Sequence, residues 1–202
     1  MHKETGSCGD YAVATLQANA NIPEGMGVDG FYHVECRDKD GNLKWEEKFP
    51  NLVVAVGKQL LLDTLLRTSG TYTTVGPFLG LTNATLTPAA TDTMTTLVGG
   101  GKEFTNYTVG GSAVRGTAVF SASTSTGSTP ANVTTASAAA ITYTITGGGG
   151  TVYGCFLVTG SGAVSTQSST AGTLYSEGNF ATAKVTTAGD TVSVTYSTTA
   201  TS

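Results

Sequence analysis

The sequence predicts a mainly β protein: an antiparallel β-sandwich of jelly-roll or immunoglobulin-like type, with one short α-helix and an extended N-terminal arm. Most of the chain after residue 75 consists of short segments in which β-branched or aromatic residues alternate with polar ones, separated by glycine-rich turns. Only one segment has helical spacing. Strands and helices do not alternate regularly, so a parallel sheet built from βαβ units is excluded.

The first element is the arm, residues 1–28. Its apolar residues, among them Tyr11, Leu16 and Ile22, follow no sustained period, and glycines and Pro23 interrupt them. Such a segment buries little of its own surface. We therefore expect these three side chains to lie on a partner protein.

A β-hairpin is expected over residues 30–49. Phe31 to Arg37 has strand character, and alternation resumes from Leu43 to Phe49 across the turn sequence at 38–42. That turn begins like a calcium-binding loop, but the later positions lack the required Gly and Glu, so a simple turn explains it. The aromatic residues Phe31, Tyr32 and Trp45 are candidates for a partner interface, with core packing as the alternative for Phe31 and Trp45.

The single helix is expected over residues 54–67. Leu61, Leu62, Leu65 and Leu66 form a stripe at helical spacing, with charged residues outside it. The stripe predicts packing of the helix on a sheet. A helix that binds a partner is the alternative.

The remaining elements complete the sandwich, so the β domain spans residues 29–202. We expect about eight or nine strands in all and one helical turn after Asp92, a plausible N-cap. Beyond the hairpin, the expected strands are Phe78 to Leu81, Ala113 to Ala122, Ala139 to Thr146, Val152 to Thr159, Thr173 to Phe180 and Thr191 to Ser197.

Charge and cysteine content narrow the functional classes. The net charge is −4 and no basic cluster is present, which argues against nucleic acid as a partner. No apolar run is long enough to span a membrane, and the first residues lack a signal peptide, so we expect synthesis in a cytoplasm. The three cysteines are widely spaced and predict reduced thiols rather than a metal site.

Charge is also distributed unevenly. Residues 1–67 hold 17 of the 24 charged side chains, while the rest of the chain is rich in Thr, Gly, Ser and Ala. Free proteins stay soluble largely through surface charge. The uneven distribution therefore favours a protein whose surface is covered by neighbouring subunits.

Catalysis is not expected. His33 has no Ser or Asp partner at a recognisable spacing, and a general base needs both an orienting group and a substrate group in reach. The β region offers only Asp92, Glu103, Glu177 and Asp190 as carboxylates, so paired carboxylates for glycoside hydrolysis are hard to find. We predict no enzymatic activity, no cofactor and no metal.

Several sequence blocks resemble those of a family of small virion structural proteins of tailed bacteriophages. The resemblance runs from about residue 30 to the end. Its blocks are Glu35 to Asp38, Trp45 to Val53, Val56 to Asp63, Phe78 to Leu81, Pro88 to Met94, Thr173 to Phe180 and Gly189 to Tyr196.

The resemblance implies a capsid cement, or decoration, protein on the capsid exterior of the virion. Such a protein would bind the outer capsid surface as a dimer or trimer and bridge subunits of the major capsid protein. A tail or head-fibre protein that binds a host receptor is the alternative.

Overall fold

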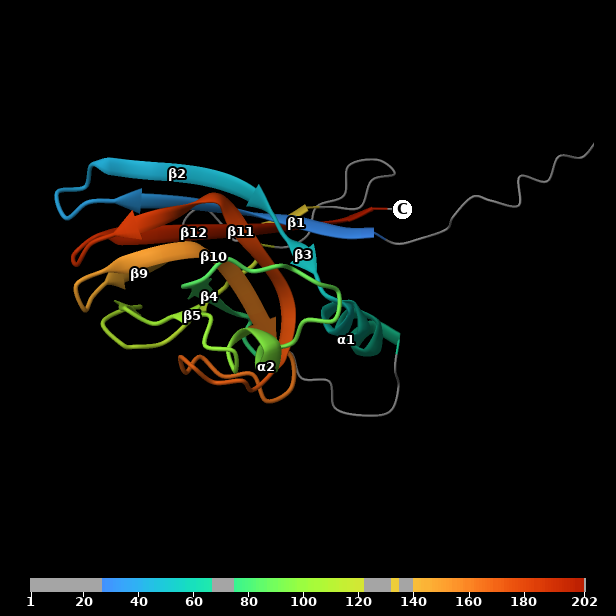
Figure 1. Ribbon diagram of the computed structural model, residues 1–202. Coiled ribbons are helices and arrows are strands. Elements are labelled where there is room, and N and C mark those ends of the chain that lie inside the picture. The colour runs from blue at the N-terminus through green and yellow to red at the C-terminus, as the bar shows by residue number, and fades with distance from the viewer. Residues whose placement is uncertain (1–26, 67–74, 122–131, 135–139, 202) are drawn as a thin grey trace, which may run out of the picture.

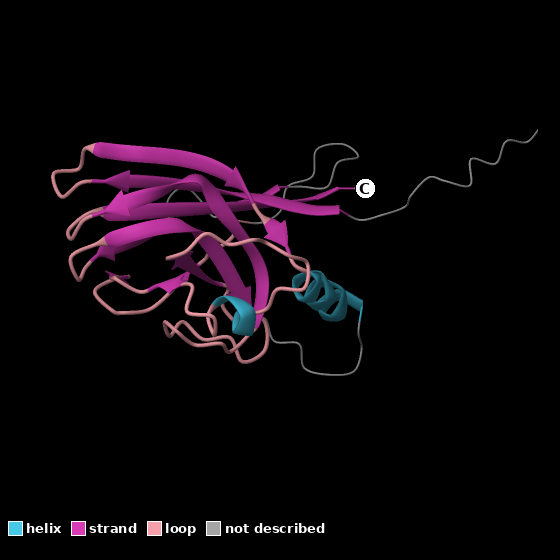
Figure 2. Ribbon diagram, viewed as in Figure 1, coloured by secondary structure: helices cyan, strands magenta, loops and turns pink. Residues whose placement is uncertain are grey.

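The computed structural model describes residues 27–66, 75–121, 132–134 and 140–201, and it shows two antiparallel β-sheets packed face to face (Figures 1 and 2). The expected antiparallel β-sandwich is confirmed. The described strands are β1 (Gly27–Arg37), β2 (Leu43–Pro50), β3 (Leu52–Val53), β4 (Phe78–Thr82), β5 (Glu103–Phe104), β6 (Tyr107–Thr108), β7 (Gly116–Thr117), β8 (Asn132–Thr134), β9 (Ile141–Ile145), β10 (Gly150–Thr159), β11 (Thr173–Thr186) and β12 (Thr191–Thr201).

One sheet has the strand order β2-β1-β12-β9-β6, with β8 also paired to β12. The other has the order β3-β11-β10-β4-β5, with β7 paired to β4. Strand β1 runs antiparallel to β12 along its whole length, so the two ends of the described chain lie side by side (Figure 1). The expected boundary at residue 28 therefore falls inside a strand, because β1 begins at Gly27.

The hairpin formed by β1 and β2 agrees with the prediction. Its turn is held by Asp38, whose carboxylate accepts hydrogen bonds from the backbone N–H groups of Asp40 and Asn42 and from the Asn42 side chain. These bonds occupy the side chain that a calcium ion would need. The turn thus needs no ion to explain its sequence.

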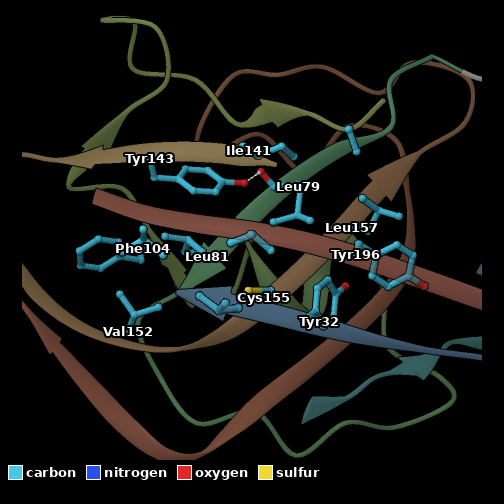
Figure 3. Close-up of a cluster of buried hydrophobic side chains, with 14 of the residues drawn as sticks. Tyr32, Leu79, Leu81, Phe104, Ile141, Tyr143, Val152, Cys155, Leu157 and Tyr196 are labelled. Carbon is cyan, nitrogen blue, oxygen red and sulfur yellow. Dashed lines mark hydrogen bonds between the residues drawn. The ribbon is translucent and has the colours of Figure 1, made fainter. Parts of the chain in front are cut away.

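The main core lies between the two sheets, and two tyrosines cross it (Figure 3). Tyr143 of β9 donates a 2.7 Å hydrogen bond to the carbonyl of Leu79 in the opposite sheet. Tyr32 of β1 makes a 2.8 Å hydrogen bond with the Ser176 hydroxyl of β11. Because both bonds are buried, they fix the position of one sheet on the other.

A second, smaller core lies on the far side of β10 and β11, under helix α2 (Met94–Leu97). Strand β10 is therefore buried on both faces: Cys155 and Leu157 point into the main core, and Phe156 and Val158 into the small one. This double burial explains why β10 is the most apolar strand in the sequence. The expected helical turn exists, but the N-cap of α2 is Thr93, and not Asp92, which lies one residue earlier.

Three expectations about the elements need correction. The strand expected at Ala113 to Ala122 is reduced to β7 in its described part, and Val119 there is 60% exposed. The short strands β3, β5, β6 and β8 were not predicted, since two or three residues carry no alternation. The helix exists as α1 (Ala55–Leu66), but its leucine stripe does not pack on the sheet.

Candidate functional site

The most unusual surface of the described chain is the outer side of α1. Leu61, Leu62, Leu65 and Leu66, here called the leucine face, are 36%, 47%, 78% and 69% exposed. Large apolar side chains gathered on one helix side commonly mark a binding surface. The leucine face is the candidate interaction site.

Gly57 explains why Leu62 and Leu66 point outward. It is buried against β11, where a Cβ atom would lie 2.5 Å from the carbonyl oxygen of Tyr175. Glycine lets the helix backbone approach the strand this closely, and the partly buried Val56 packs on the small core beside it. A helix turns by about 100° per residue, so Leu62 and Leu66 fall on the side away from Gly57. Glycine is disfavoured inside a helix, so Gly57 was the feature of the sequence that could have indicated which side of α1 is buried.

The three interface candidates of the hairpin have different surroundings. Tyr32 is fully buried in the main core, so in the folded chain it holds the sheets together instead of reaching a partner. Trp45 is partly buried, packs edge-on against Phe180 and donates a hydrogen bond to the backbone of Val185. Phe31 lies on the outer face of the sheet, with the Lys48 ammonium 3.6 Å from its ring centroid. Only Phe31 is placed on an outward surface.

The other three candidates, Tyr11, Leu16 and Ile22, lie outside the described residues. Their proposed contact with a partner stays a prediction. The start of strand β1, where the described chain begins, lies at the same end of the molecule as α1 (Figure 1).

The structure brings together two carboxyl groups that the sequence could not pair. Glu177 of β11 and Asp92 before α2 are hydrogen-bonded, and both line a small cavity of about 30 Å³ together with Lys102. Burial, and then the neighbouring Asp92, raise the pKa of Glu177 to about 8. Burial also opposes ionisation of Asp92, but hydrogen bonds from Glu177, Ala89 and Thr96 outweigh it and hold the pKa of Asp92 below its usual value. At neutral pH, protonated Glu177 thus donates to ionised Asp92.

A raised carboxyl pKa in a hollow is also a feature of catalytic acids. The cavity, however, holds about one or two water molecules and is too small for a sugar ring. The pair instead joins the loop before α2 to β11, as does Asn179, whose side chain makes two hydrogen bonds with the backbone of Leu86. The arrangement serves to hold this loop on the sheet.

A buried ion pair holds the loop that follows β10. Arg115 and Glu103 form two parallel 2.8 Å hydrogen bonds, with side chains 0% and 2% exposed. Arg115 also donates to the carbonyl of Ser169, and Glu103 accepts from the backbone N–H of Ser168. A third bond of Arg115 goes to the carbonyl of Val164, so the bonds that the pair makes beyond itself lie in the loop after β10, which marks it as structural.

His33 does have a partner, although the sequence showed none. Its Nε2 atom lies 2.7 Å from Oε1 of Glu46 on the neighbouring strand. The two residues are close because β1 and β2 pair in a register that sets Glu35 opposite Glu46. This register was not available from spacing alone.

The described cysteines, Cys36 and Cys155, are free and fully buried, as expected for reduced thiols. Burial raises the pKa of Cys36 to about 11 and that of Cys155 further. Neither thiol ionises near neutral pH. They pack as small apolar side chains.

Comparisons with models of known protein families, with the sequences of characterised proteins and with solved structures gave no match. Among the described residues, neither helix has the length and apolar character needed to cross a membrane. The functional argument therefore rests on the chain's own residues.

Proposed function

We propose that this protein is a non-enzymatic structural component of a tailed-bacteriophage virion, a capsid cement protein. It binds the outer surface of the assembled shell and bridges subunits of the major capsid protein. The resemblance of its sequence blocks to small phage virion proteins supports the origin. The leucine face of α1 is the observation that carries a binding role.

The leucine face supplies a source of binding free energy. Its four side chains are between 36% and 78% exposed, and burying them contributes roughly 1 kcal/mol each. A gain of this size is modest for one molecule. Many copies on one shell add their contributions, and a protein that binds only the assembled shell shifts the equilibrium toward it.

The body of the protein suits a passive role. The two sheets are joined by buried hydrogen bonds, and the loops near α2 and after β10 are held by the Glu177–Asp92 and Arg115–Glu103 pairs. The buried charged and titratable side chains of these pairs thus hold loops in place. A dimer or trimer on a symmetry axis of the shell is the assembly that we propose.

The test is binding of the purified protein to undecorated shells, measured by co-sedimentation. Replacing Leu62 and Leu65 with Ser is expected to weaken binding at least tenfold. Leu43→Ser is the matched control, since Leu43 is 50% exposed at the start of β2, and the start of this strand lies at the opposite end of the molecule from α1 (Figure 1). If the double variant binds as well as the control, the leucine face is not the contact.

The arm is tested separately with a chain that begins at Gly27, because this truncation leaves β1 intact. We expect it to occupy fewer shell sites than the whole chain at equal concentration; unchanged occupancy would remove the arm from the proposal. Copy number distinguishes the alternative of a tail or head-fibre protein. Hundreds of copies per particle fit a cement protein, and a handful fit a fibre.

A further inference from the structure

The outer face of the hairpin carries a cluster of three metal-ligating groups. One ring nitrogen of His33 and one carboxylate oxygen each of Glu35 and Glu46 lie within 4.8 Å of one another. His33 and Glu35 are two residues apart on β1 and point to the same face, and Glu46 of β2 is directly opposite Glu35. The three groups come from two strands whose mutual position is fixed by backbone hydrogen bonds.

Two like-charged residues directly opposite each other destabilise a strand pair unless a cation lies between them. The neighbouring cations do not fill this place. Lys48, opposite His33 in the register, has its ammonium over the Phe31 ring. Arg37 reaches Glu35 only at 3.4 Å, in an exposed pair of a kind worth little free energy.

We propose that His33, Glu35 and Glu46 form a binding site for a divalent transition-metal ion, with Zn²⁺ as the best fit. Imidazole nitrogen and carboxylate oxygens are ordinary zinc ligands, and the imidazole selects against Mg²⁺ and Ca²⁺, which prefer oxygen alone. The 2.7 Å separation of His33 Nε2 and Glu46 Oε1 widens slightly as the ion enters. Three protein ligands leave a further position open toward solvent.

The ion ties edge strand β2 to β1 and replaces the repulsion between Glu35 and Glu46 with two attractions. The side chains are only partly buried, at 34%, 34% and 48% exposed for His33, Glu35 and Glu46, so the ion reaches them without unfolding the sheet. The hydroxyl-bearing residues Thr195 and Ser193 of β12 lie opposite His33 and Glu35 on the other side of β1. They add no competing charge. This site does not depend on the proposed role in the virion.

The experiment titrates the whole chain with ZnCl₂ and follows bound ion by calorimetry and stability by thermal unfolding. We expect one ion per chain at the site and a rise of a few degrees in Tm, with no rise from equal concentrations of Mg²⁺ or Ca²⁺. His33→Gln and Glu46→Gln should each weaken binding by about tenfold or more and remove the Tm shift. In EDTA, His33→Gln is expected to unfold near the wild-type temperature, and Glu46→Gln at that temperature or above it, because Glu46→Gln also removes the repulsion from Glu35. Either result shows that the variant folds.

His2→Gln is the matched control, because it removes the other histidine of the chain. It should leave the Tm shift unchanged. The proposal is overturned if the chain binds no Zn²⁺ at millimolar concentration, if His33→Gln and Glu46→Gln bind like the wild type, or if the His2 variant alone abolishes the shift.

Discussion

Replacing Glu177 with Gln tests the buried carboxyl pair, because it keeps the size of the side chain and its hydrogen bond to Asp92 but removes the titrating proton. Glu177 is 1% exposed and its pKa is raised from 4.5 to about 8. The folded chain therefore keeps a proton that the unfolded chain loses near pH 4.5. The contribution of Glu177 to the unfolding free energy is therefore fully present below pH 4.5 and is lost as the pH rises toward 8.

The size of the effect follows from linkage. Each pH unit between the two pKa values costs about 1.4 kcal/mol of unfolding free energy. From pH 5 to pH 8 the wild type should lose on the order of 3 kcal/mol more than the Glu177→Gln variant. The lowered pKa of Asp92 acts in the opposite direction, with stability lost as the pH falls through it, so acid unfolding should remain in both proteins.

The assay is urea unfolding of both proteins at several pH values from 5 to 8. The difference between their unfolding free energies isolates Glu177, because all other groups titrate alike. Asp40→Asn, which removes an exposed carboxylate, controls for the loss of one negative charge. If the difference in unfolding free energy between wild type and Glu177→Gln stays constant from pH 5 to pH 8, Glu177 does not hold a proton in the folded state over this range.

Two further substitutions test how the loops and α1 are held. Arg115→Met should lower the unfolding free energy by roughly 3 to 5 kcal/mol, because it leaves Glu103 buried without its partner. In denaturant unfolding, the Arg115→Met/Glu103→Gln double variant should recover part of this loss. If it recovers none, the loss does not come from breaking the ion pair. Gly57→Ala should destabilise the protein although alanine is the better helix former, because its methyl group would meet the Tyr175 carbonyl. Ala55→Gly, at an exposed helical position, is the control. A gain in Tm for Gly57→Ala would show that α1 does not pack as closely on β11 as described.

The sequence by itself determined the class of fold and most of the long strands. Alternation of apolar and polar residues identified β9 and β12, and the turn residues around Asp38 identified the first hairpin, because these signals arise from neighbours in the chain. It also determined that α1 is a helix. The short strands, held only by pairing with distant segments, carried no such signal.

The tertiary structure alone decided which side of each element is buried and which charged groups meet. The leucine stripe of α1 has the spacing of a buried face, yet all four leucines are exposed, and the close approach at Gly57 turns Leu62 and Leu66 away from the sheet. Glu177 and Asp92 become one proton-sharing pair only because α2 folds back over β11, and His33 meets Glu46 only through the register of β1 with β2. Periodicity describes one helix or strand at a time, while burial and charge pairing depend on which other elements pack against it. For this chain, the candidate sites depend on that packing between elements.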